Sequence, residues 1–99
     1  MAAAPASTLQ RVTLYDEPDP LALACGRTLA PVDVAYATFG TLDDDGANAV
    51  FVCHALTGDA RATGPGGWWP TMVGPGRPVD TDRWFVICAN LLGGCQGTT

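Results

Sequence analysis

The chain has 99 residues, of which 47% are hydrophobic and 15% are charged. This composition fits one small domain or a piece of a larger one, and it excludes an intrinsically disordered chain, which needs low hydrophobicity and high charge. The formal net charge is -5, Lys is absent and the five Arg residues are scattered, so nucleic-acid binding is disfavoured.

The sequence also bears on where the protein works. No segment approaches the roughly 18 consecutive apolar residues that span a bilayer. The Ala-rich stretch 1–10 lacks the basic and long apolar regions of a secretory signal. We therefore expect a cytoplasmic protein that does not cross a membrane. The four Cys residues do not resemble a dense disulfide framework, and Cys53 and Cys88 lie in apolar runs, where a free thiol behaves as a small hydrophobe.

The first forty residues predict short strands around turns. Residues 1–20 are expected to form a tail and a loop, with a short edge strand over 11–15. Residues 21–24 predict a strand that ends in a tight turn at Gly26. The stretch 32–39 alternates with a period of two, which predicts that it pairs with this strand as an antiparallel hairpin.

Two later stretches, 49–54 and 84–89, are continuously apolar. Such runs are typical of strands covered on both faces, as in a parallel sheet. The acidic stretch 43–46 precedes the first of them and predicts a solvated turn. A calcium loop is the alternative, but the stretch lacks the alternating ligands and the closing Glu of such a loop.

About thirty residues separate the two apolar strands, which is enough for a crossover between parallel strands. The stretch 58–76 is so rich in Gly and Pro that only 68–73 could form a turn or two of helix. Trp68 and Trp69 either cover the sheet or line a pocket, and the first interpretation is favoured. Both apolar strands are followed by loops of small residues, which we expect at one edge of the sheet.

Few side chains in the sequence can carry chemistry. Adjacent residues such as Cys53 and His54 should point to opposite faces of a strand, and no Cys-x-x-Cys pair occurs, so we expect no metal site. Ser7 is the only serine and His54 the only histidine, so a Ser–His–acid triad cannot be built from these residues. A Cys95 nucleophile with His54 as its base is an alternative to a packed Cys95 and a structural His54. The Gly-rich stretch 93–97 lacks the Lys-Ser/Thr of a phosphate loop.

Several blocks of sequence match a known family in order and with compatible spacing. They are Val34–Leu42 (VAYATFGTL), Asn48–Asp59 (NAVFVCHALTGD), Gly66–Trp69 (GGWW), Val73–Gly76 (VGPG) and 80–99. In these blocks the chain resembles the amino-terminal part of the homoserine O-acetyltransferase family, over about 21–99. The resemblance implies an α/β fold class, in which this chain supplies the antiparallel opening and the first parallel strands of an α/β-hydrolase domain. Cys25 departs from the family, which more often has Ser at that place.

The resemblance implies a reaction as well. Members of the family transfer an acetyl group from acetyl-CoA, a co-substrate rather than a bound cofactor, to the hydroxyl of L-homoserine on the way to methionine. The reaction passes through an acyl-serine, and the serine, aspartate and histidine of the family lie beyond the position that corresponds to Thr99. The expected partners are these two small molecules, with no nucleic acid and no membrane, and a homodimeric parent protein is one option.

Two loops receive roles from the same resemblance. The backbone N–H of Leu56 matches one half of the family's oxyanion hole, in a loop shaped by His54, Thr57 and Gly58. A second loop resembles one that borders the entrance to the active site. Its residues in this chain are Asn90, Gly93, Gly94 and Cys95.

The matched part of the family ends before the catalytic residues. We therefore expect a fragment that is truncated before its nucleophile, and we expect the 99-residue chain alone to be inactive and poorly stable. Two alternatives stay open. The chain could be a non-enzymatic interaction module that descends from a hydrolase, or part of a related enzyme that uses another acyl donor or accepts serine.

Overall fold

The computed structural model describes residues 9–55, 58–93 and 97–99. Eight strands lie in these ranges, and several of them are only two residues long. In chain order they are β1 (Gln10–Tyr15), β2 (Leu21–Ala22), β3 (Thr28–Leu29), β4 (Val32–Phe39), β5 (Ala49–Val52), β6 (Val73–Gly74), β7 (Val79–Asp80) and β8 (Phe85–Ala89).

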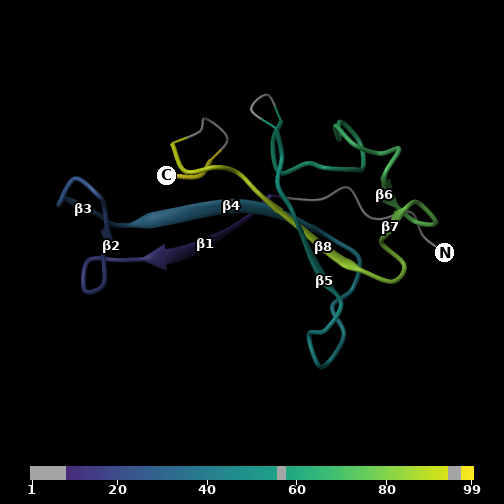
Figure 1. Cartoon of the computed structure of the whole chain (residues 1–99), viewed down its shortest axis with the longest axis horizontal. Coiled ribbons are helices and arrows are strands. Elements are labelled where there is room, and N and C mark those ends of the chain that lie inside the picture. Colours follow the sequence, from purple (N-terminus) through teal and green to yellow (C-terminus); the bar gives the residue numbers. More distant parts are fainter. Residues whose placement is uncertain (1–8, 56–57, 94–96) are drawn as a thin grey trace.

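Four of the strands form one mixed sheet in the order β1-β4-β8-β5 (Figure 1). β1 and β8 both run antiparallel to β4, whereas β5 runs parallel to β8. Two small pairs lie beside this sheet, an antiparallel β2–β3 hairpin and a parallel β6–β7 pair. The arrangement has the expected order, because antiparallel strands at its opening are followed by a parallel pair.

The partner of β4 differs from the sequence-based expectation. β4 pairs with β1, from Gln10 opposite Tyr36 to Tyr15 opposite Val32, and not with the strand that begins at Leu21. That strand turns back at Gly26 and pairs only with β3, so the predicted hairpin with 32–39 is wrong. The physical reason is length, since the six-residue β1 offers β4 a longer ladder of hydrogen bonds than the two-residue β2 can. The predicted edge strand over 11–15 is confirmed, and it begins one residue earlier.

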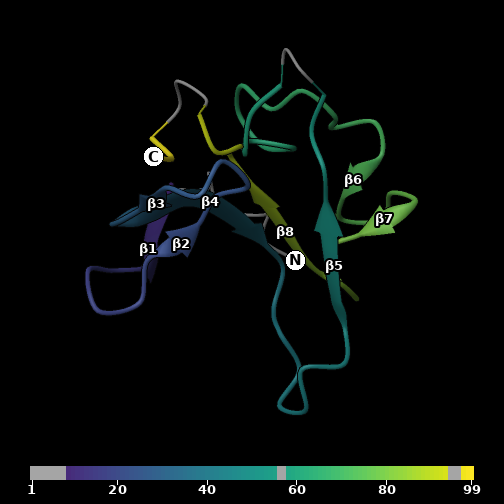
Figure 2. The same ribbon diagram turned by 60° about the vertical axis from the view of Figure 1, so that its left-hand side comes forward.

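β5 and β8 are the two apolar strands that the sequence predicts, and their parallel pairing is confirmed. Val50 lies opposite Val86, and Val52 lies opposite Cys88. Both strands are shorter than the apolar runs, because β5 ends at Val52 and β8 begins at Phe85. Figure 2 shows the two strands side by side, with the β6–β7 pair beyond β5.

One face of the sheet is covered by the segment that connects β5 to β8. Side chains of the sheet and of this segment form one buried cluster, to which Trp68 and Met72 add partly buried apolar surface. The cluster contains Ala37, Phe39, Val52, Ala60, Ala62, Val73, Val86 and Cys88. The interpretation of Trp68 as a cover for the sheet is therefore confirmed, and Trp69 stacks on it with a centroid separation of 5.5 Å.

The connecting segment has no helix in its described part. The stretch 68–73 makes a single turn, in which the carbonyl of Trp69 accepts the N–H groups of Met72 and Val73, both at 3.1 Å. The hydroxyl of Thr63 holds the segment from the other side by donating to the carbonyl of Val73 at 2.6 Å. Gly and Pro residues limit the segment to such turns, as the composition predicts.

The opposite face of the sheet is open. Phe51 is 61% exposed and Leu14 is 58% exposed, and the thiol of Cys53 is exposed as well. Two expectations are therefore wrong for the described residues: β5 is not covered on both faces, and Cys53 does not behave as a packed hydrophobe. Cys88 is buried as expected.

The amino-terminal end of β5 is fixed by a buried asparagine. Asn48 accepts the N–H of Asp43 at 2.8 Å and donates to the carbonyls of Thr41 and Arg83, both at 2.9 Å. The N–H of Gly46 donates to the carbonyl of Asp43 at 2.9 Å, which closes the exposed acidic turn. The solvated turn predicted over 43–46 is thus confirmed. Across the described ranges, no group of side chains could hold a metal ion.

Candidate functional site

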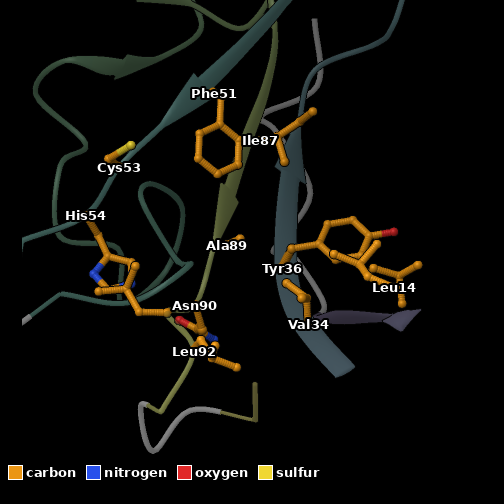
Figure 3. Close-up of a pocket in the computed structure, with 12 residues that line it drawn as sticks. Leu14, Val34, Tyr36, Phe51, Cys53, His54, Ile87, Ala89, Asn90 and Leu92 are labelled. Atoms are coloured by element: carbon orange, nitrogen blue, oxygen red, sulfur yellow. The ribbon is translucent and has the colours of Figure 1, made fainter. Parts of the chain in front are cut away.

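The loops after β5 and β8 meet at one edge of the sheet, as predicted from the parallel order of these strands. His54 follows the end of β5 and Asn90 follows the end of β8. Both side chains line an open depression of about 480 Å³ on the uncovered face (Figure 3). Most of its other walls are apolar side chains of the sheet, among them Val34, Tyr36, Phe51 and Ile87.

His54 is held by its own loop. Its Nδ1 lies 2.7 Å from the carbonyl oxygen of Ala55. A carbonyl can only accept, so Nδ1 carries the hydrogen and donates it. The other ring nitrogen, Nε2, is buried and has no hydrogen-bond partner within the described ranges. This hydrogen bond agrees with the favoured structural interpretation, an imidazole that fixes the loop, and the role of His54 stays a prediction. Cys53 lines the same depression as His54, so the strict alternation of side-chain directions ends with β5.

The loop after β5 is closed by a glycine. The N–H of Gly58 donates to the carbonyl of Ala55 at 2.8 Å. A Cβ atom at Gly58 would lie 3.0 Å from the Cβ of His54, which is closer than side-chain atoms normally approach. A side chain here would therefore force His54 or the loop backbone to shift by a few tenths of an ångström. Leu56 and Thr57, which the sequence analysis placed at this loop, lie outside the described residues.

The chain directly after Gly58 is anchored by side chains from other elements. The carbonyl of Asp59 accepts the indole N–H of Trp68 at 2.7 Å and the thiol of Cys88 at 3.6 Å. The N–H of Ala60 donates to Oδ1 of Asn90 at 2.7 Å. Ala60 is fully buried, so loss of this acceptor would leave a buried N–H unpaired, at a cost of about 1–3 kcal/mol.

The second loop returns to the sheet at the end of the chain. The backbone N–H of Asn90 donates to the carbonyl of Ala35 at 2.9 Å, beyond the last paired residue of β8. From there the ladder is continued by hydroxyls, since Thr98 accepts the N–H of Ala35 at 2.9 Å and Thr99 accepts the N–H of Asp33 at 2.8 Å. Gly93 is tied to Thr99 through its N–H, at 2.8 Å.

Two of the expected residues of this second loop, Gly94 and Cys95, lie outside the described residues. The proposed pair of a Cys95 nucleophile and a His54 base therefore stays a prediction. Nothing in the sequence predicted the contacts of Thr98 and Thr99. They depend on where the chain returns to β4, which no local pattern encodes.

Two side chains near this region have shifted pKa values. Burial, followed by the charge of Asp59 and the proximity of Cys53, raises the pKa of the Cys88 thiol to about 11. Cys88 is therefore inert as a nucleophile at neutral pH. Farther along the connecting segment, the N–H groups of Gly76 and Asp82 lower the pKa of Asp80 by donating to its carboxylate. The described residues thus supply a fixed, largely apolar scaffold for a loop and hold no paired nucleophile and base.

We compared the sequence of the chain with those of known proteins. No family model matches the chain. The chain is 57% identical over 96 residues to a homoserine O-succinyltransferase of Nocardioides sp., covering 91% of the chain and 26% of that protein. It is 59% identical over 85 residues to a homoserine O-acetyltransferase of Gluconobacter oxydans, covering 80% of the chain and 22% of that protein. The chain is a homologue of the homoserine O-acyltransferases.

Solved structures agree with this assignment. The crystal structure of a homoserine O-acetyltransferase from Bacillus anthracis superposes with a TM-score of 0.74 at 31% identity, covering 85% of this chain and 23% of that one. The chain spans about a quarter of the length of the curated relatives it matches. In the part of the chain that the structure describes, no helix has the length and apolar character needed to cross a bilayer.

Proposed function

We propose that this chain forms the amino-terminal quarter of an enzyme that transfers an acyl group from a CoA thioester to the hydroxyl of L-homoserine, on the way to methionine. The observation that supports the proposal most strongly is the 50–59% identity to relatives with homoserine O-acyltransferase names, over 80–91% of the chain. The expectations of a cytoplasmic location and of a homodimeric parent stay predictions.

We further propose acetyl-CoA as the donor, although relatives named for acetyl transfer and for succinyl transfer are both similar to the chain. In the proposed reaction a serine outside these 99 residues attacks the thioester carbonyl, CoA leaves, and the acyl-serine is then attacked by the hydroxyl of homoserine. The aspartate and histidine that would assist it also lie outside. No cofactor needs to stay bound.

The contribution of this chain would be electrostatic. We propose that the backbone N–H of Leu56 is one donor of the oxyanion hole, where it would stabilise the negative charge that develops on the carbonyl oxygen. Three features fix the described residues on either side of this place. They are the hydrogen bond from His54 to Ala55, the bond from Gly58 to Ala55, and the bond from Ala60 to Asn90. A donor held in advance need not reorganise during the reaction.

The experiment is a chimera. The matched quarter of the Gluconobacter oxydans relative is replaced by this chain, and release of the CoA thiol is measured with acetyl-CoA or succinyl-CoA and with L-homoserine or L-serine. We expect turnover of acetyl-CoA with homoserine within about tenfold of the intact relative, a difference of ~1.4 kcal/mol in the barrier. The 99-residue chain alone is expected to be inactive, because the nucleophile is absent from it.

Four outcomes would redirect the proposal. Turnover only with succinyl-CoA would overturn the choice of donor, and turnover only with serine would overturn the choice of acceptor. A chimera that folds but has no activity in any combination would favour the alternative of an interaction module that descends from the enzyme. Acyl-enzyme formation on the 99-residue chain alone would point to Cys95 as a nucleophile.

A further inference from the structure

A buried asparagine joins the two loops of the candidate site. Asn90 is only 5% exposed and directly follows β8. Its backbone N–H donates to the carbonyl of Ala35 on β4, and its side-chain Oδ1 accepts the N–H of Ala60 at 2.7 Å. Figure 3 shows Asn90 at the end of β8, on the same side of the depression as His54. One residue therefore links β4, β8 and the segment that follows β5.

The place of the contact along the chain matters. Ala60 comes two residues after Gly58, whose N–H closes the loop back to Ala55. Upstream of the loop, β5 is fixed by its pairing with β8. Downstream, the bond from Ala60 to Asn90 is the first backbone amide contact that joins the segment after Gly58 to the loop of the other strand. The loop that follows β5 is thus connected to β8 before it begins, through strand pairing, and to Asn90 after it ends.

We propose that Asn90 is a positioning residue, which fixes the segment directly after the loop that follows β5 through its hydrogen bond to Ala60. The inference rests on the proposed function, because it assumes that the loop carries an oxyanion donor. Asn90 acts through Ala60 and need not contact the substrate. Without its Oδ1, the buried N–H of Ala60 must find another acceptor, and the loop must move to reach one. A displacement of about 1 Å at a catalytic group can lower the rate by about a hundredfold.

The other contacts in this region do not duplicate the role. Trp68 and Cys88 both donate to the carbonyl of Asp59, so they hold the opposite side of the peptide chain and satisfy an acceptor. Neither offers an acceptor to the N–H of Ala60. The role therefore depends on one side-chain oxygen at one position, which makes it testable by substitution.

The chain contains a matched control. Asn48 is also a buried asparagine, 6% exposed, and among the described residues its side chain bonds to backbone groups alone. It lies at the amino-terminal end of β5, whereas Asn90 lies at the carboxyl-terminal edge where the loops meet. Loss of either asparagine removes side-chain hydrogen bonds to backbone groups. Only loss of Asn90 should change the geometry of the loop.

The experiment compares Asn90→Leu, Asn90→Asp and Asn48→Leu in the chimeric enzyme described above. Asn90→Leu should lower kcat by about 10- to 100-fold and leave KM for homoserine within about threefold, since the loop acts on the transition state. Asn90→Asp keeps an accepting oxygen and should recover at least part of kcat. Asn48→Leu should lower the melting temperature and leave kcat of the folded enzyme unchanged.

Two further readouts separate this inference from the proposed function. Hydrolysis of p-nitrophenyl acetate reports on the nucleophile and the oxyanion hole without homoserine. Hydrogen exchange of the peptide that contains Ala60 reports on the loop without any activity. We expect faster exchange there in Asn90→Leu than in wild type or Asn48→Leu. Wild-type enzyme that is inert towards homoserine, together with this change in exchange, would overturn the proposed function and the catalytic consequence but uphold the link between the loops.

The inference on Asn90 is overturned by any of three results. These are unchanged exchange at Ala60 in Asn90→Leu, a kcat within twofold of wild type, or an equal loss of kcat in Asn48→Leu. If Asn90→Leu does not fold, Asn90→Asp decides alone. Asn90→Asp then supports the inference if its exchange at Ala60 stays close to wild type and its kcat is higher than that of an Asn90→Ser variant, which is too short to reach Ala60.

Discussion

The two faces of the central sheet differ in what they present and in how they are covered. The face under the connecting segment carries small or fully buried side chains, such as Ala37 and Val86, both 0% exposed. The other face carries larger side chains, such as Tyr36 and Phe51, around the open depression. The size of a side chain therefore does not reveal which face is covered. Ala37 lies where the second layer approaches closely, but the large Phe39 is buried on that same face, and Phe51 is exposed on the other.

A charge placed on each face should give the largest contrast. Val52 and Phe51 are neighbours on β5, and they are 8% and 61% exposed. Val52→Asp should cost about 4 kcal/mol or more, because it buries an unpaired carboxylate in the core cluster. Phe51→Asp should change the free energy of unfolding by no more than ~0.5 kcal/mol and should improve solubility. Urea unfolding of the expressed chain measures both, and equal losses would show that the open face is covered in solution.

Two threonines test the same contrast through hydrogen bonds. Thr63, buried under the sheet, donates to the carbonyl of Val73 at 2.6 Å, whereas Thr38 on the open face accepts from Gln10 at 3.2 Å. Thr63→Val should cost about 1–3 kcal/mol, because the carbonyl of Val73 loses its donor.

The threonine prediction has two controls, also read by urea unfolding. Thr63→Ser keeps the hydroxyl and should recover most of the stability. Thr38→Val should cost no more than ~0.5 kcal/mol. A loss at Thr38 as large as the loss at Thr63 would contradict the comparison.

The thiols give the smallest effect and add a pH dependence. The pKa of Cys88 is raised from 9.0 to about 11, chiefly by burial, so at pH 8 only about a thousandth of it is thiolate. Cys53 is exposed on the opposite face. Iodoacetamide at pH 8 should therefore modify Cys53 and spare Cys88, as peptide mapping by mass spectrometry can show. Rapid modification of Cys88 in the folded chain would disprove its burial.

The sign of the pH effect follows from the direction of this shift. The unfolded chain loses the Cys88 proton near pH 9, and the folded chain keeps it until about pH 11. Ionisation then favours the unfolded state, so stability should be unaffected below pH 9 and should fall between pH 9 and 11. Cys88→Ala should remove that part of the fall. The free energy of unfolding, measured across this range, checks the prediction.

Sequence patterns were sufficient for features that depend on neighbouring residues. The apolar runs at 49–54 and 84–89 predicted two parallel strands, and the position of His54 and Asn90 after them predicted that their loops meet. The acidic turn at 43–46 was readable because Asp and Gly favour turns locally.

Most of the specific contacts between distant parts of the chain were not readable. The hairpin expected between 21–24 and 32–39 failed because the competing strand, β1, lies earlier in the sequence. The prediction that Cys53 is buried failed because an apolar run does not show which faces of the strand will be covered. The bond from Ala60 to Asn90 was missed because it joins residues thirty positions apart. Asn90 itself was found only through the family resemblance.

The acidic turn closed by Asn48 has a practical consequence. It lies at one extremity of β5, whereas His54 lies at the other. Asp44, at the tip of this turn, is exposed. A short affinity tag or a fluorophore introduced there would protrude from the pole of the molecule remote from the depression. Such a handle would let the protein be immobilised or tracked while the surfaces around Asn90 stay free for ligands.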